Sequence, residues 1–331
     1  MMKAIWYTQP GNAIDVLQYG DLDIPEPGAG EVRVRVHASG VNPSDTKFRS
    51  GWMGLRQPYD RTIPHNDGAG IIDAVGEGVS SARVGERVWI YEAQRGSASG
   101  TAAEYAVVPN HKAVTLPESF GFDGGASLGV PAMTAHFLVF SEGPVEGKTI
   151  LVHGGAGAVG IYAIQLAKWG NAKTVIATVS SDEKAAIAQT MGADSVINYR
   201  QEDVVARVRD AVGKRGCDRI LDVALAANME INAQLVARNG VIAAYESGDA
   251  PQVTLPFYDL LYKNAALRTV LVYAMDDVAH TAAARDINQA IADGALHALP
   301  TKRYPLAETA AAHDALDSGQ IIGKVVVDCF V

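Results

Sequence analysis

Hydrophobic and polar residues alternate strictly near the start of the chain. Residues 31–36 read EVRVRV and place Val32, Val34 and Val36 on one face, which predicts a strand with one buried face. Segments rich in Pro and Gly separate further short apolar runs at 71–75, 87–91 and 104–108. This spacing predicts a small β-rich barrel or sandwich in the first part of the chain.

The pattern changes near residue 130, where apolar strands begin to alternate with helical stretches. The predicted strands are KTILVHG (148–154), AKTVIATV (172–179), DSVINYR (194–200), CDRILDVA (217–224), NGVIAAYE (239–246) and LRTVLVY (267–273). Their apolar runs do not alternate, as expected for parallel strands that are covered on both faces. The tail 280–331 adds one or two helices and a final strand, KVVVDCFV.

Length and charge narrow the classes of protein that fit. A chain of 331 residues suggests about two domains. The net charge of −9 disfavours a nucleic-acid partner, which requires a basic face. The N-terminus lacks an apolar signal core, and no run approaches the length of a membrane span. The two cysteines form no disulfide framework, so we expect a cytoplasmic protein that does not bind membranes.

The strongest motif is the G-x-G-x-x-G loop Gly155-Ala156-Gly157-Ala158-Val159-Gly160, which follows a predicted strand and opens a predicted helix. In such a loop the first glycine permits the tight turn and the second lets a pyrophosphate approach the backbone. The third allows close packing of the helix. Free backbone N–H groups at the start of the helix favour an anionic diphosphate. We therefore predict a dinucleotide site.

The end of the second strand favours NADP(H) over NAD(H). An NAD site usually has Asp or Glu about 20 residues after the glycine loop, at the tip of that strand. Here the tip holds Ser180 and Ser181, and Lys184 follows in the first helical turn, which suits a 2′-phosphate. Two alternatives remain open: Asp182 as a displaced ribose ligand, and Ser180 with Glu183 as a capping box.

Metal and hydrolase chemistry are poorly supported. Neither cysteine has a neighbour that suits a zinc site, and neither an HExxH nor a G-x-S-x-G motif is present. His65 lies in the polar segment 64–70, where a single histidine is more commonly a structural hydrogen-bonding residue. His153 ends the strand before the glycine loop, and we interpret it as structural as well.

A series of short motifs occurs in the order and spacing of one family, over nearly the whole chain. They are Val41-Asn42-Pro43-Ser44-Asp45, Arg49-Ser50-Gly51, Asp67-Gly68-Ala69-Gly70, Ala74-Val75-Gly76, Gly100–Tyr105, Leu128–Ala135, Val152–Gly160, Val196–Arg200, Tyr304-Pro305-Leu306 and Gly323-Lys324. With these motifs, the chain resembles the zinc-independent quinone oxidoreductases of the zeta-crystallin type, in the medium-chain dehydrogenase/reductase superfamily.

The resemblance implies an α/β fold with a doubly wound, parallel Rossmann sheet and a GroES-like β-rich catalytic domain. Residues 1–130 form the GroES-like domain, which residues 269–331 complete, and residues 131–268 form the NADP(H)-binding domain. The active cleft is expected at their junction. The resemblance also implies a homodimer or homotetramer.

The resemblance implies NADPH as the cofactor and assigns residues to it. Lys184 and Tyr199 are expected near the 2′-phosphate, Thr134 near the nicotinamide ribose, and Asn42 near the nicotinamide and the substrate. Tyr245 and Lys324 complete the expected cofactor-binding set. Gly319 stands where the family often has an arginine that helps to bind phosphate.

Two further features separate this chain from its relatives. In zinc-dependent relatives a Gly-His-Glu occupies the place of His65-Asn66-Asp67, so Asn66 replaces the ligand histidine. In the quinone reductases tyrosines often lie near the quinone, whereas this chain has Lys47 and Met53 at those positions.

We therefore predict transfer of a hydride from NADPH to a small molecule, a quinone or an enone. An alternative acceptor is a 2-alkenal or an acryloyl thioester. Asn42, Lys47 or a bound water is the expected donor to the acceptor oxygen. Asp45 is either a helix-start carboxylate or a residue of the pocket. A structural or RNA-binding role is disfavoured by the intact glycine loop and the net charge of −9.

Overall fold

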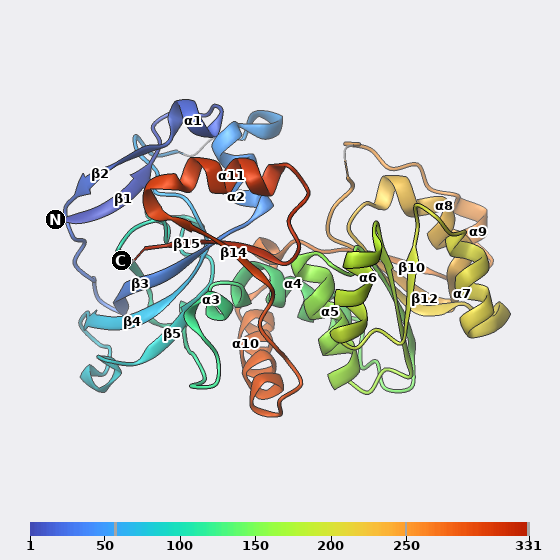
Figure 1. Cartoon of the computed structure of the whole chain (residues 1–331). Helices are drawn as coiled ribbons and strands as arrows, with labels where there is room; N and C mark the ends of the chain where they lie inside the picture. Colours follow the sequence, from blue (N-terminus) through green and yellow to red (C-terminus); the bar gives the residue numbers. More distant parts are fainter. Residues whose placement is uncertain (56–57, 249, 330–331) are drawn as a thin grey trace. The chain divides into compact units, whose positions relative to one another are not determined.

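The computed structural model describes residues 1–55, 58–248 and 250–329, which form two compact units (Figure 1). Met1–Val130 and Ala298–Val331 make up the first unit, and Pro131–His297 makes up the second. The chain thus leaves the first unit after Val130 and returns to it at Ala298.

The first unit is built on a mostly antiparallel sheet with the strand order β14-β15-β3-β4-β5-β7, and β6 also pairs with β3. Val32, Val34 and Val36 of β3 are fully buried, as the alternating pattern predicted. A short sheet of β1 and β2 lies beside this core. The strands are β1 (Met2–Trp6), β2 (Gln18–Leu22), β3 (Glu31–Val41), β4 (Asp67–Val75), β5 (Arg87–Ile90), β6 (Tyr105–Pro109), β7 (Ala113–Thr115), β14 (Thr301–Pro305) and β15 (Lys324–Asp328).

Four α-helices belong to the described part of the first unit: α1 (Ala13–Val16), α2 (Pro43–Ser50), α3 (Phe122–Gly125) and α11 (Thr309–Asp317). Helix α11 packs against α1, α2 and the returning strands β14 and β15 (Figure 1). The C-terminal segment is therefore part of the core of this unit rather than an appendage.

The second unit contains a parallel sheet with the order β10-β9-β8-β11-β12-β13. In sequence order this is 3-2-1-4-5-6, the order of the Rossmann fold. The strands are β8 (Thr149–His153), β9 (Thr174–Val179), β10 (Ser195–Asn198), β11 (Cys217–Asp222), β12 (Val236–Ala244) and β13 (Ala266–Thr269).

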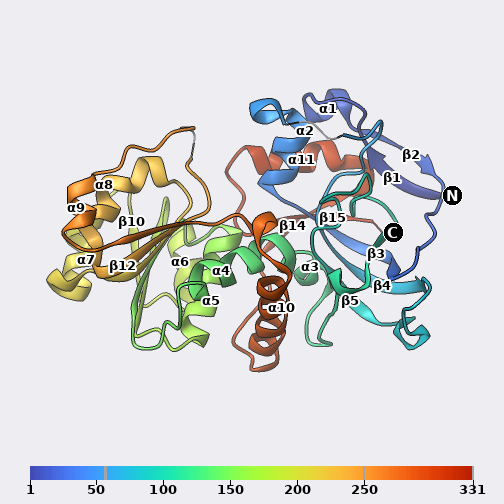
Figure 2. The ribbon, with the colours of Figure 1, turned by 180° about the vertical axis from the view of Figure 1, so that it is seen from behind.

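Helices cover this sheet on both faces, which explains the apolar runs of β8 and β9. One layer is a hydrophobic core in which α7 and α8 cover Leu151, Ile176 and Ile220. Helix α5 packs on β8 and β9, with α4 and then α10 beside it (Figures 1 and 2). The helices are α4 (Met133–Phe140), α5 (Ala158–Trp169), α6 (Asp182–Thr190), α7 (Val204–Val212), α8 (Leu225–Leu235), α9 (Phe257–Leu261) and α10 (Asp277–Ala292).

The return to the first unit lies later in the chain than residue 269, where the sequence analysis placed it. Residues up to His297 belong to the second unit. The reason is tertiary packing, because β13 pairs with β12 and the long helix α10 packs against α4.

Among the helices of the described residues, none combines the length and the apolar character that crossing a membrane requires.

Candidate active site

Three strand ends meet in the first unit. Asn42 directly follows β3, Asp67 begins β4 and Lys324 begins β15. Strand β3 is antiparallel to both neighbours, with Gly40 opposite Asp67 and Val41 opposite Val325. This register brings Asn42, Asp67 and Lys324 together, although 257 residues separate the last two.

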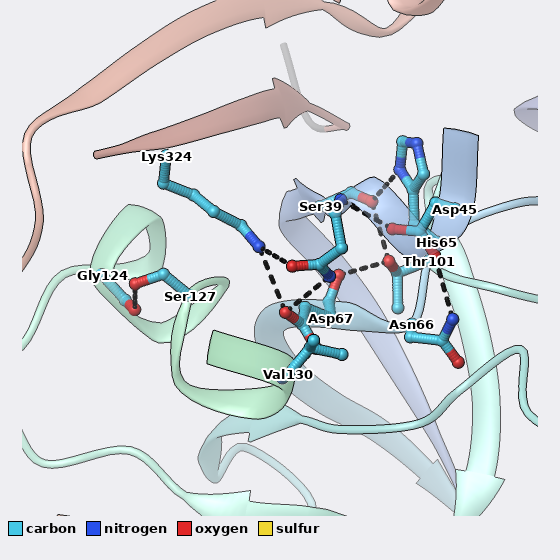
Figure 3. Close-up of polar contacts among 11 residues, drawn as sticks. Ser39, Asp45, His65, Asn66, Asp67, Thr101, Gly124, Ser127, Val130 and Lys324 are labelled. Carbon is cyan, nitrogen blue, oxygen red and sulfur yellow. Dashed lines mark hydrogen bonds and ion pairs between the residues drawn. The ribbon is translucent and has the colours of Figure 1, made fainter. Parts of the chain in front are cut away.

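The three side chains form a closed triangle of polar contacts, and Figure 3 labels two of them, Lys324 and Asp67. Lys324 Nζ donates to Asn42 Oδ1 at 2.5 Å and to Asp67 Oδ2 at 3.2 Å. Asn42 Nδ2 donates to the same Asp67 oxygen at 2.9 Å, and the Val130 backbone N–H donates to Asp67 Oδ1 at 2.8 Å. Because a carboxylate only accepts and an ammonium only donates, these contacts fix the orientation of the Asn42 amide.

A second carboxylate lies beside this triangle. Asp45 Oδ2 accepts from the Asn42 backbone N–H at 2.8 Å, and Asp45 Oδ1 accepts from Asn66 Nδ2 at 2.9 Å. Asp45 therefore has the helix-start position in α2 that the sequence suggested, and its side chain is buried. Burial, and then the charge of Asp67, raise the pKa of Asp45 to about 7.

The charges of Asp67 and Lys324 depend on each other. Burial raises the pKa of Asp67, and Lys324 is the strongest influence in the opposite direction. Burial lowers the pKa of Lys324, and Asp67 is the strongest influence that opposes it. Removal of either partner would leave the other buried without its counter-ion.

A series of hydrogen-bonded hydroxyl and imidazole groups extends from the backbone carbonyl of Asp67. Thr101 Oγ1 donates to the Asp67 carbonyl oxygen at 2.5 Å, so Ser39 Oγ, at 2.7 Å, must donate to Thr101. His65 Nδ1–H then donates to Ser39 Oγ at 2.8 Å. The neutral His65 accepts at Nε2 from His313 Nε2–H at 2.8 Å. His65 thus has the structural hydrogen-bonding role that its sequence context indicated.

We expect these two histidines to make the stability of the fold sensitive to acid. Burial lowers the pKa of His65 well below its usual value and lowers that of His313 to about 3. Between that value and the ordinary pKa of about 6.5, the unfolded chain binds a proton at His313 that the native state does not. We expect the free energy of unfolding to fall with decreasing pH in this window, by up to about 1.4 kcal/mol per pH unit for His313.

The matched variant is His313→Gln, whose amide N–H can still donate to His65 but cannot gain a proton. Thermal unfolding of the variant, followed from neutral to acidic pH, should show a smaller loss of stability than that of the wild type. Equal losses in the two proteins would remove His313 from the set of acid-sensitive groups.

Lys47, which the sequence analysis named with Asn42 as an expected donor to the acceptor oxygen, lies on α2 and is half-buried. Its Nζ lies 4.6 Å from the centre of the Trp52 ring, a cation–π distance. Trp52 and Met53 are exposed, and Met53 has a left-handed backbone with φ of 52°. Lys47 thus lies against Trp52, and Met53, the other position where the resemblance implies a tyrosine, follows Trp52 in the chain.

The glycine loop of the second unit connects β8 to α5 at the point where the strand order reverses. The sequence analysis assigned the tight turn to Gly155, and this was wrong by one residue. Gly154 has the positive φ, 72°, and leaves β8 in the left-handed conformation. Gly155 is needed for packing, because a Cβ there would lie 2.7 Å from the Ala177 side chain on β9.

The other two glycines of the motif fit a diphosphate cradle. A Cβ at Gly160 would lie 2.2 Å from the Gly154 carbonyl oxygen, so α5 approaches the loop too closely for a side chain. At Gly157 the one described atom within 4 Å of a Cβ is that same oxygen, at 3.4 Å. The space beside Gly157 and the N-terminus of the twelve-residue helix α5 suit a bound pyrophosphate. Ala156, Ala158 and Val159 continue this segment.

Ser180 and Lys184, which the sequence analysis assigned to a 2′-phosphate, are in contact after β9. Lys184 Nζ donates to Ser180 Oγ at 3.1 Å, and Tyr199, after the neighbouring strand β10, is 51% exposed. Ser181, not Ser180, caps α6, and its Oγ accepts from the Lys184 backbone N–H. The predicted capping box was wrong because Val179 is still paired in the sheet and Ser180 is needed to leave it.

The alternative role for Asp182 finds no support in its contacts. Asp182 Oδ1 accepts from Asn198 Nδ2 at 3.1 Å, which ties the start of α6 to the end of β10. Of the remaining predicted residues, Thr134 is buried in the first turn of α4, and Tyr245 follows β12 with its backbone N–H on the Asp222 carbonyl oxygen. Lys324 contacts Asn42 and Asp67, as described above.

The sequence analysis gave no role to Asp67, Asn66 or Asp222, which organise the polar groups of the two units. A signal for Asp67 was present in the motif Asp67-Gly68-Ala69-Gly70. A Cβ at Gly70 would lie 2.0 Å from the Arg35 carbonyl oxygen, so β3 and β4 approach closely three residues after Asp67. Within the described ranges, no group of three or more His, Cys, Asp and Glu side chains is arranged to hold a metal ion.

Comparison with known proteins identifies the family. The alcohol dehydrogenase GroES-like domain model matches residues 28–118, and the zinc-binding dehydrogenase model matches residues 158–287. A quinone oxidoreductase of Pseudomonas aeruginosa is 32% identical, over 99% of this chain and 99% of its own length. That of Sus scrofa is 31% identical, over 99% and 98%.

The chain belongs to the quinone oxidoreductase family. As a member of that family of medium-chain dehydrogenases/reductases, it is an oxidoreductase with a GroES-like β-rich unit and a Rossmann unit, and the fold class predicted from the sequence is confirmed.

Solved structures of family members and one further relative add detail. The quinone oxidoreductase of Escherichia coli complexed with NADPH is 26% identical, with a TM-score of 0.85 over 98% of this chain and 99% of its own. A mycobacterial protein complexed with NADPH is 30% identical, with a TM-score of 0.85 over 99% and 100%. A 2-haloacrylate reductase of a Burkholderia species is 29% identical, over 99% of the present chain and 98% of the reductase.

Proposed function

We propose that the protein transfers a hydride from NADPH to a quinone without a zinc ion. The observation that carries the proposal is the glycine cradle at the reversal point of the sheet, together with Lys184 and Ser180 after β9. These groups fit a diphosphate and a 2′-phosphate respectively. NADPH in two structures of similar proteins supports the same choice of cofactor.

The residues of the first unit supply orientation and hydrogen bonding in this proposal. When bound, NADPH supplies the hydride from its nicotinamide ring. The Asn42 amide, held by Lys324 and Asp67, uses one N–H on Asp67. Its second N–H is the group that we assign to the acceptor oxygen, where negative charge develops during reduction. Lys47 is the alternative donor.

Two observations support zinc independence. Asn66 stands where zinc-dependent relatives have a ligand histidine, and its amide donates to Asp45. Both cysteines are buried, and burial raises the pKa of the Cys217 thiol to about 12, which disfavours a thiolate ligand.

A second acceptor class, α,β-unsaturated carbonyl compounds, is favoured by one comparison and one feature of the sequence. The 2-haloacrylate reductase is similar over the whole chain. Lys47 and Met53 replace the tyrosines that the family often places near a quinone.

Oxidation of NADPH and NADH should therefore be followed with benzoquinone, phenanthrenequinone, an alkenal, a crotonyl thioester and a simple ketone, with and without a chelator. We expect NADPH-preferring turnover of the quinones that survives chelation. Turnover limited to the alkenal or the thioester would assign the second acceptor class, and loss of turnover with chelator would refute zinc independence.

Lys184→Ala tests the cofactor site. Loss of a charge-assisted hydrogen bond to the 2′-phosphate should raise the KM for NADPH about tenfold or more. The KM for NADH, which lacks this phosphate, should change little. Steady-state kinetics with both cofactors measures this, and equal effects on the two would remove Lys184 from the phosphate site.

We also propose that the protein forms a homodimer, or a homotetramer built from such dimers, through the edge of the Rossmann sheet. Strand β13 is an edge strand of this sheet, and all four of its residues are exposed. Large exposed apolar side chains occur on this strand and in the segments just before and after it in the sequence: Leu255, Phe257, Tyr258, Leu261, Tyr262, Leu267 and Leu271. Such an edge is an open template for pairing with another strand.

Light scattering of the purified protein tests this proposal. The wild type should have the mass of two or four chains, and a lysine at Leu267 should shift it toward one chain. Val278→Lys changes a more exposed apolar residue on α10 and should leave the mass unchanged. A wild-type monomer would overturn the proposal.

A further inference from the structure

A series of buried, hydrogen-bonded side chains links three neighbouring strands of the Rossmann sheet, next to the glycine loop. His153, the last residue of β8, lies between Thr178 of β9 and Asn232 of α8. Its Nδ1 lies 3.0 Å from Thr178 Oγ1, and its Nε2 lies 2.9 Å from Asn232 Oδ1. Asn232 Nδ2 in turn donates to Asp222 Oδ2 at the end of β11.

The contacts determine the position of each shared proton in this hydrogen-bonded series. The Asp222 carboxylate only accepts, so Asn232 directs its N–H toward Asp222 and its oxygen toward His153. His153 therefore carries its proton on Nε2. Burial lowers the pKa of His153, so the ring is neutral and Nδ1 accepts from the Thr178 hydroxyl.

Thr178 and Asp222, at the two ends of this hydrogen-bonded series, also help to hold the glycine loop. The Thr178 carbonyl oxygen accepts from the Gly155 N–H at 2.9 Å. Asp222 Oδ1 accepts from the Ala224 N–H at 2.7 Å, which fixes the turn that contains Val223. Val223 packs against Gly154, where a Cβ would lie 2.9 Å from its Cγ1. His153 immediately precedes Gly154, so it lies between the two sides of the loop.

We infer that His153 is a positioning residue for dinucleotide binding, which fixes the glycine loop by linking the ends of β9 and β11 to β8. This inference rests on the proposed function, because it concerns the affinity for NADPH. A packing role alone would affect stability. A positioning role affects the affinity for the diphosphate as well, because small displacements of the backbone N–H groups weaken hydrogen bonds that depend on distance and angle.

Three variants of His153 separate its two hydrogen bonds. His153→Gln keeps an N–H donor near the position of Nε2, and His153→Asn keeps an acceptor near the position of Nδ1. His153→Leu keeps neither. His280→Leu is the matched control, because His280 is equally buried in the same unit but lies on α10.

The experiment measures the Kd for NADPH by fluorescence titration of the protein without acceptor, together with the melting temperature. We expect His153→Leu to raise the Kd about tenfold, equivalent to about 1.4 kcal/mol. The Gln and Asn variants should lie between it and the wild type, and His280→Leu should lower the melting temperature without changing the Kd. The KM for NADPH should rise while kcat at saturating NADPH stays near the wild-type value.

The outcomes distinguish the two proposals. A wild-type protein that does not bind NADPH would overturn the proposed function and this inference together. If the wild type binds NADPH but the folded His153 variants bind it equally well, the inference alone is overturned. If His153→Leu does not fold, the Gln and Asn variants still decide between these results.

Discussion

Replacing Lys324 with methionine is expected to lower the free energy of unfolding by about 3–5 kcal/mol, the cost typical of removing one partner of a buried ion pair. Lys324 is 2% exposed and Asp67 is fully buried. Methionine leaves the Asp67 carboxylate without its counter-ion and the Asn42 oxygen without its donor. Chemical denaturation of the purified variant measures the loss.

The double variant Lys324→Met, Asp67→Asn provides the decisive comparison. If the loss arises from an unpaired buried charge, removal of the charge at Asp67 should restore part of the stability. Lys214→Met changes an exposed lysine and should cost little. A double variant less stable than Lys324→Met would show that packing, rather than charge, dominates at this site.

The single variant Lys324→Met also tests the proposed reaction. Without Lys324, the Asn42 amide loses the contact that fixes its oxygen, so the N–H assigned to the acceptor is no longer held in one direction. We expect kcat for quinone reduction to fall while the Kd for NADPH changes less, because the contact between Lys184 and Ser180 is unaltered. The assay should be run at a temperature where the variant remains folded.

Gly160→Ala is expected to abolish most NADPH binding. The new Cβ would lie 2.2 Å from the Gly154 carbonyl oxygen, and a backbone atom cannot move aside as a flexible side chain can. The loop and α5 must therefore separate. Overpacking of this kind costs roughly 1–3 kcal/mol. If the displacement is transmitted fully to the diphosphate cradle, the Kd for NADPH rises by up to about a hundredfold.

Gly157→Ala is the matched control within the same motif. Its Cβ has room in the protein, with the Gly154 oxygen at 3.4 Å, but occupies the space assigned to the diphosphate. It should therefore weaken NADPH binding with little loss of stability, whereas Gly160→Ala weakens both. NADPH titration and thermal unfolding of both variants test this contrast. Tight NADPH binding by Gly157→Ala would place the diphosphate elsewhere.

The local features of this protein are determined by its sequence. The alternation in 31–36 predicted the buried valines of β3, and the apolar runs after residue 130 predicted a parallel sheet, because a strand covered on both faces has no polar side. The glycine motif predicted the loop between β8 and α5, since close backbone approach requires the absence of Cβ. The resemblance to quinone oxidoreductases also followed from sequence motifs.

Contacts between distant segments were decided by the tertiary structure. Nothing in the sequence around Lys324 indicates that its ammonium meets Asn42 and Asp67, because that contact depends on the register of three antiparallel strands. The proton positions at His65, His313 and His153 depend on partners that folding brings together. Sequence pattern records which face of an element is buried, whereas the partner of a buried polar group depends on how the elements pack.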